Sequence, residues 1–201
     1  MEFNIPNILT LVRLALIPLF VGVMYFPDHW LAVPTAGLTA AGIFVAAAVT
    51  DAFDGYLARK WNQTTPFGAF LDPVVDKLMV MAALIVLVDL QRVPSVLALV
   101  IIGREIAISA LREWMAQRGK SANVAVSTLG KIKTTAQMIA IPFLLYDKWL
   151  FGVIPCHWIG TFALWIAAVL TLVSMVYYLQ VALKAGAMEK GKSFDGPMSA
   201  D

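Results

Sequence analysis

The sequence has 201 residues, of which 60% are hydrophobic and only 14% are charged. Soluble domains carry roughly 25% charged residues, so this composition excludes an ordinary soluble domain. The net charge of +2 does not by itself indicate a class of partner, and we expect no nucleic-acid partner. The single cysteine, Cys156, excludes an intrachain disulfide.

Six apolar segments follow one another along the chain, and each is long enough to cross a hydrocarbon core of about 30 Å. The predicted spans are 7–26, 35–59, 66–88, 94–115, 125–146 and 158–183. Thr65 followed by Pro66 is typical of a helix N-cap and first helical position, so the third helix should begin there. We expect an all-α polytopic membrane protein. A six-transmembrane-helix bundle would occupy residues 1–184, and a flexible cytoplasmic tail residues 185–201.

The basic residues of the connections indicate the orientation in the membrane. The first, third and fifth connections carry only two Lys or Arg residues, Arg92 and Lys148. The second and fourth connections, with their flanking helix ends, and the tail carry ten basic residues: Arg59, Lys60, Arg112, Arg118, Lys120, Lys131, Lys133, Lys184, Lys190 and Lys192. The positive-inside rule therefore predicts a multi-pass protein of the inner (cytoplasmic) membrane with both termini in the cytoplasm.

Four aspartates flank the second connection: Asp51, Asp54, Asp72 and Asp76. Within each pair the spacing places both carboxylates on one helix face, and in an antiparallel helix pair the four would meet at similar depths. Such carboxylates repel unless cations neutralise them, and an all-oxygen ligand set favours Mg²⁺ or Mn²⁺. The pattern predicts a site for two divalent ions at the cytoplasmic face, suited to displacement at phosphorus. The alternative is that the aspartates cap helices or pair with Arg59, Lys60 and Lys77.

The same stretch resembles a family signature. The pattern Asp-x2-Asp-Gly-x2-Ala-Arg-x8-Gly-x3-Asp-x3-Asp, from Asp51 to Asp76, is similar to that of the CDP-alcohol phosphotransferase family. The resemblance implies that a CDP-linked lipid donates its phosphatidyl group to an alcohol and that CMP leaves. It also implies that the four aspartates bind two metal ions and that Asp76 is the general base.

The resemblance also implies a nucleotide site. Gly55, Ala58 and Arg59 would lie along the nucleotide, together with Gly68. Helix packing is the alternative for the small residues.

Basic residues of the fourth and fifth spans suggest the acceptor. Arg104, Arg112, Lys131 and Lys133 are predicted to form a pocket for a second phosphate, because guanidinium and ammonium groups suit phosphate oxygens. Gln137 is predicted to support this pocket. The alternatives are that the arginines pair with Glu105, Glu113 or the aspartates, and that the lysines face anionic lipid headgroups.

One face of the first span carries Asn7, Thr10 and Arg13 at i, i+3 and i+6. Asn7 and Thr10 are assigned to the nucleotide and Arg13 to support of the site. Helix capping by Asn7 and snorkelling by Arg13 are the alternatives.

An acceptor with its own phosphate indicates sn-glycerol 3-phosphate, and the basic runs resemble the bacterial family members that use it. The predicted reaction makes phosphatidylglycerol phosphate and CMP from CDP-diacylglycerol. Inositol, inositol phosphate or serine is the alternative acceptor, and an ion-coupled transporter is the alternative from another class. Membrane lipids are expected partners, and a homodimer is possible.

Overall fold

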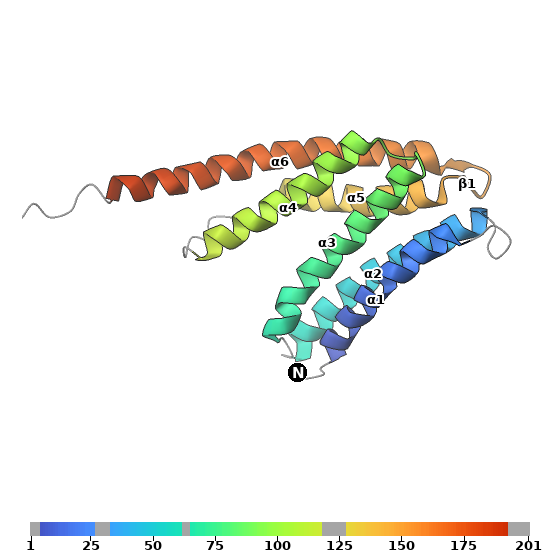
Figure 1. The fold of residues 1–201 in the computed structure, drawn as a ribbon, viewed down its shortest axis with the longest axis horizontal. Helices are drawn as coiled ribbons and strands as arrows, with labels where there is room; N and C mark the ends of the chain where they lie inside the picture. Colours follow the sequence, from blue (N-terminus) through green and yellow to red (C-terminus); the bar gives the residue numbers. More distant parts are fainter. Residues whose placement is uncertain (1–4, 27–32, 62–64, 118–127, 193–201) are drawn as a thin grey trace, which may run out of the picture.

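The structure is a computed structural model that describes residues 5–26, 33–61, 65–117 and 128–192 (Figure 1). Within these ranges, the side chains of residues 5–6, 33–34, 54–59, 61, 66, 128–131 and 181–192 are not described. Six helices make up most of the described chain: α1 (Ile5–Tyr25), α2 (Val33–Trp61), α3 (Pro66–Asp89), α4 (Ser95–Gln117), α5 (Thr128–Tyr146) and α6 (Cys156–Lys192). This confirms a mostly helical architecture. The one departure among the described residues is a short antiparallel hairpin of β1 (Trp149–Leu150) and β2 (Ile154–Pro155).

The helix limits follow local sequence signals. The Thr65 side chain accepts a hydrogen bond from the Gly68 backbone N–H at 3.0 Å, so Thr65 caps α3 and Pro66 takes the first helical position, as predicted. At the other end of the chain, α6 continues to Lys192 rather than ending near residue 183. Apart from Gly186 and Gly191, residues 184–192 are Ala, Met, Glu and Lys, which favour helix.

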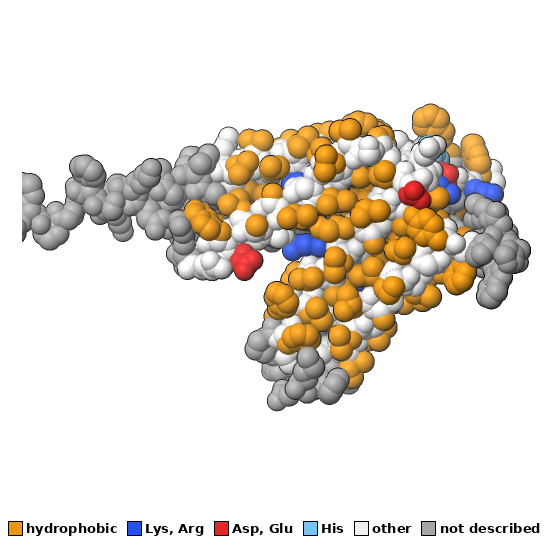
Figure 2. Space-filling view, viewed as in Figure 1, with side chains coloured by type: hydrophobic (Ala, Val, Ile, Leu, Met, Phe, Trp, Pro, Cys, Tyr) orange, Lys and Arg blue, Asp and Glu red, His pale blue; other side chains and the backbone are white. Residues whose placement is uncertain are grey.

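Three helices contain a stretch long and apolar enough to cross a membrane, counting only described residues: Asn7–Tyr25, Thr35–Phe53 and Cys156–Gln180. Of the other three, α3 carries Asp72, Asp76 and Lys77 within its length, and α4 carries Arg104, Glu105 and Arg112. Exposed apolar side chains cover much of the outer surface (Figure 2). Such a surface suits the hydrocarbon interior of a bilayer.

The helices form two groups that diverge toward the N-terminal end of α3 (Figure 1). In one group, α6 packs against α4 and α5, and in the other α1 packs against both α2 and α3. Contact between α2 and α5 links the groups. A β-carbon on Gly37 would lie 2.6 Å from the Leu145 carbonyl oxygen, so the absence of a side chain there allows the approach of α2 to α5.

The prediction that α2 and α3 form a packed antiparallel pair is wrong. These helices contact each other far less than either contacts α1. The aspartates of the two helices are therefore connected through α1. The reason is that α1 presents buried polar side chains, Asn7, Thr10 and Arg13, toward α2 and α3.

Candidate active site

Arg13 of α1 lies at the centre of the aspartate cluster. Its side chain is only 2% exposed, and its Nη1 lies 2.6 Å from Oδ1 of Asp51 on α2 and 2.6 Å from Oδ1 of Asp76 on α3. Its Nη2 lies 3.4 Å from Oδ1 of Asp72. Because Arg13 Nη1 lies 2.6 Å from both, the Oδ1 atoms of Asp51 and Asp76 are at most twice 2.6 Å apart. Carboxylates from two helices thus gather around one positive charge. The alternative that Arg13 extends its charged end to the membrane surface is wrong, because its side chain is buried against the aspartates.

The carboxylates remain open to solvent. The side chains of Asp51, Asp72 and Asp76 are 37%, 40% and 46% exposed. No group of three Asp, Glu, His or Cys side chains stands at metal-binding geometry among the described residues, and the Asp54 side chain lies outside them. The donors nevertheless suit a hard divalent cation, since all are carboxylates, reachable by an ion, and already grouped around a cationic side chain.

Thr10 and Asn7 connect α1 to the start of α3. The hydroxyl of Thr10, a residue that is 1% exposed, donates to Oδ1 of Asp72 at 2.5 Å. Asn7 Oδ1 accepts a hydrogen bond from the Thr65 hydroxyl at 2.8 Å. Thr10 thus orients an aspartate, and Asn7, which lies inside α1, joins the cap of α3. These contacts indicate support of the aspartates, and contact with a nucleotide stays a prediction for both residues.

Gly68 allows α1 and α3 to approach closely. A β-carbon at this position would lie 2.5 Å from Asn7 Oδ1 and 3.1 Å from the Thr65 hydroxyl oxygen. Close packing therefore accounts for Gly68, which was the alternative to nucleotide binding.

We expect Gly68→Ala to displace the Asn7 side chain and weaken the cap of α3. Loss of a cap interaction costs about 1 kcal/mol, which corresponds to a melting temperature lower by roughly 2–4 °C. Thermal unfolding of the purified protein measures this. Ala69→Ser, at an exposed position one residue along the helix, is the control and should leave the melting temperature unchanged. An unchanged melting temperature for Gly68→Ala would contradict the packing role.

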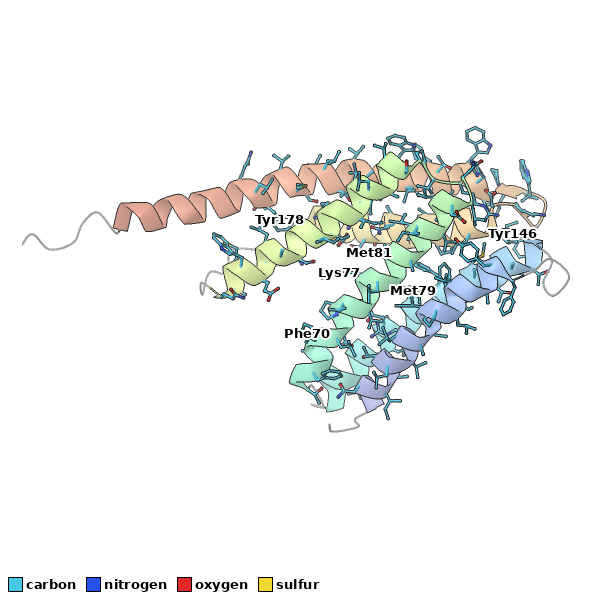
Figure 3. All side chains as sticks on the ribbon, in the orientation of Figure 1. Phe70, Lys77, Met79, Met81, Tyr146 and Tyr178 are labelled. Carbon is cyan, nitrogen blue, oxygen red and sulfur yellow. The ribbon has the colours of Figure 1, made fainter. Side chains whose placement is uncertain are left out.

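A cavity of about 370 Å³ connects the aspartates with the basic residues of α4 and α5. Asp51 of α2 and Asp76 of α3 line it, and so do Arg112 of α4 and Lys133 and Gln137 of α5. Lys77 of α3, labelled in Figure 3, also lines it. Figure 2 shows basic side chains in the recess between α3 and α4, on a largely apolar surface. One space can therefore hold both an anion on the basic wall and a group that reacts at the aspartates.

Lys133 and Arg104 differ in their relation to this cavity. Lys133 is 3% exposed and forms a close ion pair with Glu105, which also lines the cavity. Arg104 is not among the lining residues. Its Nη2 donates to Ser174 Oγ of α6 at 2.7 Å, and its Nη1 lies 3.8 Å from Oε1 of Glu105. Ser174 and Glu105 thus hold the Arg104 guanidinium in this structure, and its contact with the acceptor phosphate stays a prediction.

Several predicted site residues lie outside the described side chains, so the structure does not place them: Asp54, Gly55, Ala58, Arg59 and Lys131. The sequence-based prediction missed Ser174 and Tyr178 of α6. Tyr178 Oη accepts a hydrogen bond from Arg112 Nη2 at 3.0 Å. The available signal was their i, i+4 spacing, which places two polar groups on one face of an apolar helix.

Comparison with known proteins identifies the class. The family model described as CDP-alcohol phosphatidyltransferase matches residues 3–176. The chain therefore belongs to the CDP-alcohol phosphatidyltransferase family. A relative from Pectobacterium atrosepticum is 54% identical over 186 residues, which cover 90% of this chain and 96% of the relative. Relatives from Shigella flexneri and Escherichia coli K12 are each 50% identical over the same shares of the two chains. All three are named CDP-diacylglycerol–glycerol-3-phosphate 3-phosphatidyltransferase.

Proposed function

We propose that this protein is a phosphatidylglycerophosphate synthase, which transfers the phosphatidyl group of CDP-diacylglycerol to sn-glycerol 3-phosphate. The products are phosphatidylglycerol phosphate and CMP. Family membership and the shared name of the relatives support the reaction. The observation that carries the choice of acceptor is that Asp51 and Asp76 line the same cavity as Arg112 and Lys133. An acceptor with a phosphate at one end and a hydroxyl at the other can contact both the basic residues and the aspartates.

The acceptor hydroxyl attacks the phosphorus atom that bears the diacylglycerol group. The new P–O bond forms as the P–O bond to CMP breaks, in line with it. Asp76, exposed to the cavity, takes the hydroxyl proton. Two divalent ions, Mg²⁺ or Mn²⁺, held by Asp51, Asp54, Asp72 and Asp76, would neutralise charge on the diphosphate and acidify the hydroxyl.

The other residues bind and orient the substrates. Arg112 and Lys133 bind the acceptor phosphate, for which Lys133 partly exchanges its contact with Glu105. Gln137, buried and on the cavity wall, offers a further hydrogen bond. Gly55, Ala58 and Arg59 lie along the nucleotide, as the family signature implies, and Lys131 adds positive charge at the start of α5.

The position of the protein in the membrane follows from the distribution of its charges and the length of its helices. We infer six membrane spans, with the site and both termini at the cytoplasmic face of the inner membrane, because the basic residues gather on that side. CDP-diacylglycerol can then keep its acyl chains in the bilayer while a soluble acceptor reaches the cavity from the cytoplasm. A homodimer is compatible with the apolar outer surface.

The test is CMP release from CDP-diacylglycerol by the purified protein in Mg²⁺ or Mn²⁺. Glycerol 3-phosphate, inositol, inositol phosphate and serine are offered one at a time. Glycerol 3-phosphate should give the highest kcat/KM. A higher value with any other acceptor would overturn the assignment.

We expect Arg112→Ala to raise the KM for glycerol 3-phosphate about tenfold, because a charge-assisted hydrogen bond contributes roughly 1.5–3 kcal/mol. The KM for CDP-diacylglycerol should stay within about twofold. Gln117→Ala, also exposed on α4 but outside the cavity lining, is the matched control. If Arg112→Ala left the KM for glycerol 3-phosphate unchanged, the proposed phosphate pocket would be wrong.

A further inference from the structure

Two arginines of α4 contact the same tyrosine of α6. Tyr178 is 2% exposed and is labelled in Figure 3. The guanidinium carbon of Arg112 lies 5.3 Å from its ring centroid and that of Arg104 lies 5.8 Å away. Both distances are within the range of a cation–π contact, about 6 Å. Eight residues of helix separate the arginines by about 12 Å along α4, so the Tyr178 ring lies between them.

The contact with Arg112 is also a directed one. Arg112 Nη2 donates to Tyr178 Oη at 3.0 Å, and the structure gives no other hydrogen bond to Arg112 within its described residues. The guanidinium carries five N–H donors, so those not used by Tyr178 can reach an anion in the cavity that Arg112 lines. The Tyr178 hydroxyl thus holds the Nη2 group of Arg112, and the other N–H groups of the guanidinium can bind a ligand.

Tyr178 itself is buried, next to a hydrogen-bonded part of α6. It is buried against α4, and one turn earlier on α6 Ser174 accepts the hydrogen bond from Arg104. Ser174 in turn donates to the Thr171 carbonyl at 3.0 Å. A buried ring and hydroxyl therefore meet the long and otherwise exposed side chain of Arg112. Ordering a free arginine costs about 2 kcal/mol of rotamer entropy, part of which Tyr178 removes before a ligand binds.

We propose that Tyr178 is a positioning residue for the acceptor, which holds the Arg112 guanidinium at the cavity wall in the orientation that receives the phosphate. This inference rests on the proposed function, because it assigns Arg112 to the phosphate of glycerol 3-phosphate. Tyr178 does not touch the substrate and acts through Arg112. It makes α6, none of whose described side chains lines the cavity, part of acceptor selection.

The rival interpretation is that Tyr178 only joins α4 to α6. Kinetic constants and stability separate the two. A residue that only joins helices alters the melting temperature and leaves the two KM values unchanged or changes them together. A residue that positions Arg112 alters the KM for glycerol 3-phosphate alone.

The experiment uses the full-length protein in Mg²⁺, with CMP release measured at varied glycerol 3-phosphate and at varied CDP-diacylglycerol. Tyr178→Phe keeps the ring and removes the hydroxyl. We expect it to raise the KM for glycerol 3-phosphate about 3–10-fold, the size of one hydrogen bond to a charged group with partial solvent access. The kcat and the KM for CDP-diacylglycerol should stay within about twofold. Tyr178→Leu, which also removes the ring, is the second variant and should raise the same KM at least as far.

Two controls lie on the same helix. Ser174→Ala removes a hydrogen bond between α4 and α6, but at Arg104, which is outside the cavity lining. Tyr177→Phe removes a hydroxyl from the neighbouring, exposed tyrosine. Both should leave the KM for glycerol 3-phosphate unchanged, even where Ser174→Ala lowers the melting temperature.

A double variant tests whether Tyr178 acts through Arg112. Arg112→Ala with Tyr178→Phe should have the KM of Arg112→Ala alone, within about twofold, because the hydroxyl has lost its partner. If the KM for glycerol 3-phosphate in the double variant rose by the product of the two single increases, the proposal would be overturned. The same holds if Tyr178→Phe and Ser174→Ala had equal KM values for glycerol 3-phosphate. If Arg112→Ala raises the KM and Tyr178→Phe does not, only the role of Tyr178 fails. If Arg112→Ala also has no effect, the acceptor site of the proposed function fails with it.

Discussion

Asp76→Asn is expected to lower kcat for CMP release by roughly 10³-fold, within the 10²–10⁴ range that general-base catalysis supplies. An amide cannot accept the hydroxyl proton of the acceptor. The substitution also removes one of the two carboxylates that lie 2.6 Å from Arg13 Nη1, and with it one negative charge that would hold a divalent ion. The KM for glycerol 3-phosphate should change little, since the phosphate end of the acceptor is assigned to Arg112 and Lys133, which lie on other helices.

A chemically matched control lies on the same helix. Asp89, at the C-terminal end of α3, accepts a hydrogen bond from Tyr25 and is exposed, far along the helix from the cavity. Asp89→Asn should keep full activity. Retention of more than a tenth of the wild-type kcat by a folded Asp76→Asn variant would contradict the base assignment. A comparable loss in Asp89→Asn would show that the effect comes from the stability of α3.

The sequence predicted the helices well because their signals are local. The apolar runs gave all six segments to within a few residues, apart from the longer C-terminal end of α6, and the Thr65–Pro66 pair gave the start of α3. Each signal depends on residues that are neighbours in the chain. The hairpin at β1 and β2 was missed because its strands are only two residues long, too short to show an alternating pattern.

The arrangement of helices was harder to predict. The spacing of the aspartates shows which carboxylates share a face, but it does not show which helix lies between α2 and α3. That helix is α1, and Arg13 was assigned only a supporting role although it contacts three aspartates. The partner of Arg104 could not be predicted either. Only the packing of α4 on α6 shows that its guanidinium donates to Ser174.

Arg13→Met is expected to lower the melting temperature in EDTA. Methionine has a similar length but no charge, so the variant leaves Asp51, Asp72 and Asp76 without the guanidinium between them. Removing one partner of a buried ion pair costs about 3–5 kcal/mol, and we expect about 1–3 kcal/mol here because these carboxylates are 37–46% exposed. The melting temperature should fall by roughly 3–10 °C.

The response to divalent ions gives the sharper result. A cation that binds the folded state stabilises it by mass action, and in Arg13→Met the same carboxylates have lost a competing cation. Added Mg²⁺ should therefore raise the melting temperature of Arg13→Met more than that of the wild type. Lys148→Met removes one positive charge at an exposed position between α5 and β1 and should match the wild type in both conditions. If Arg13→Met is as stable as the wild type in EDTA, its contacts with the aspartates do not stabilise the fold. If its response to Mg²⁺ is no larger than that of the wild type, the divalent ion and Arg13 do not share these carboxylates.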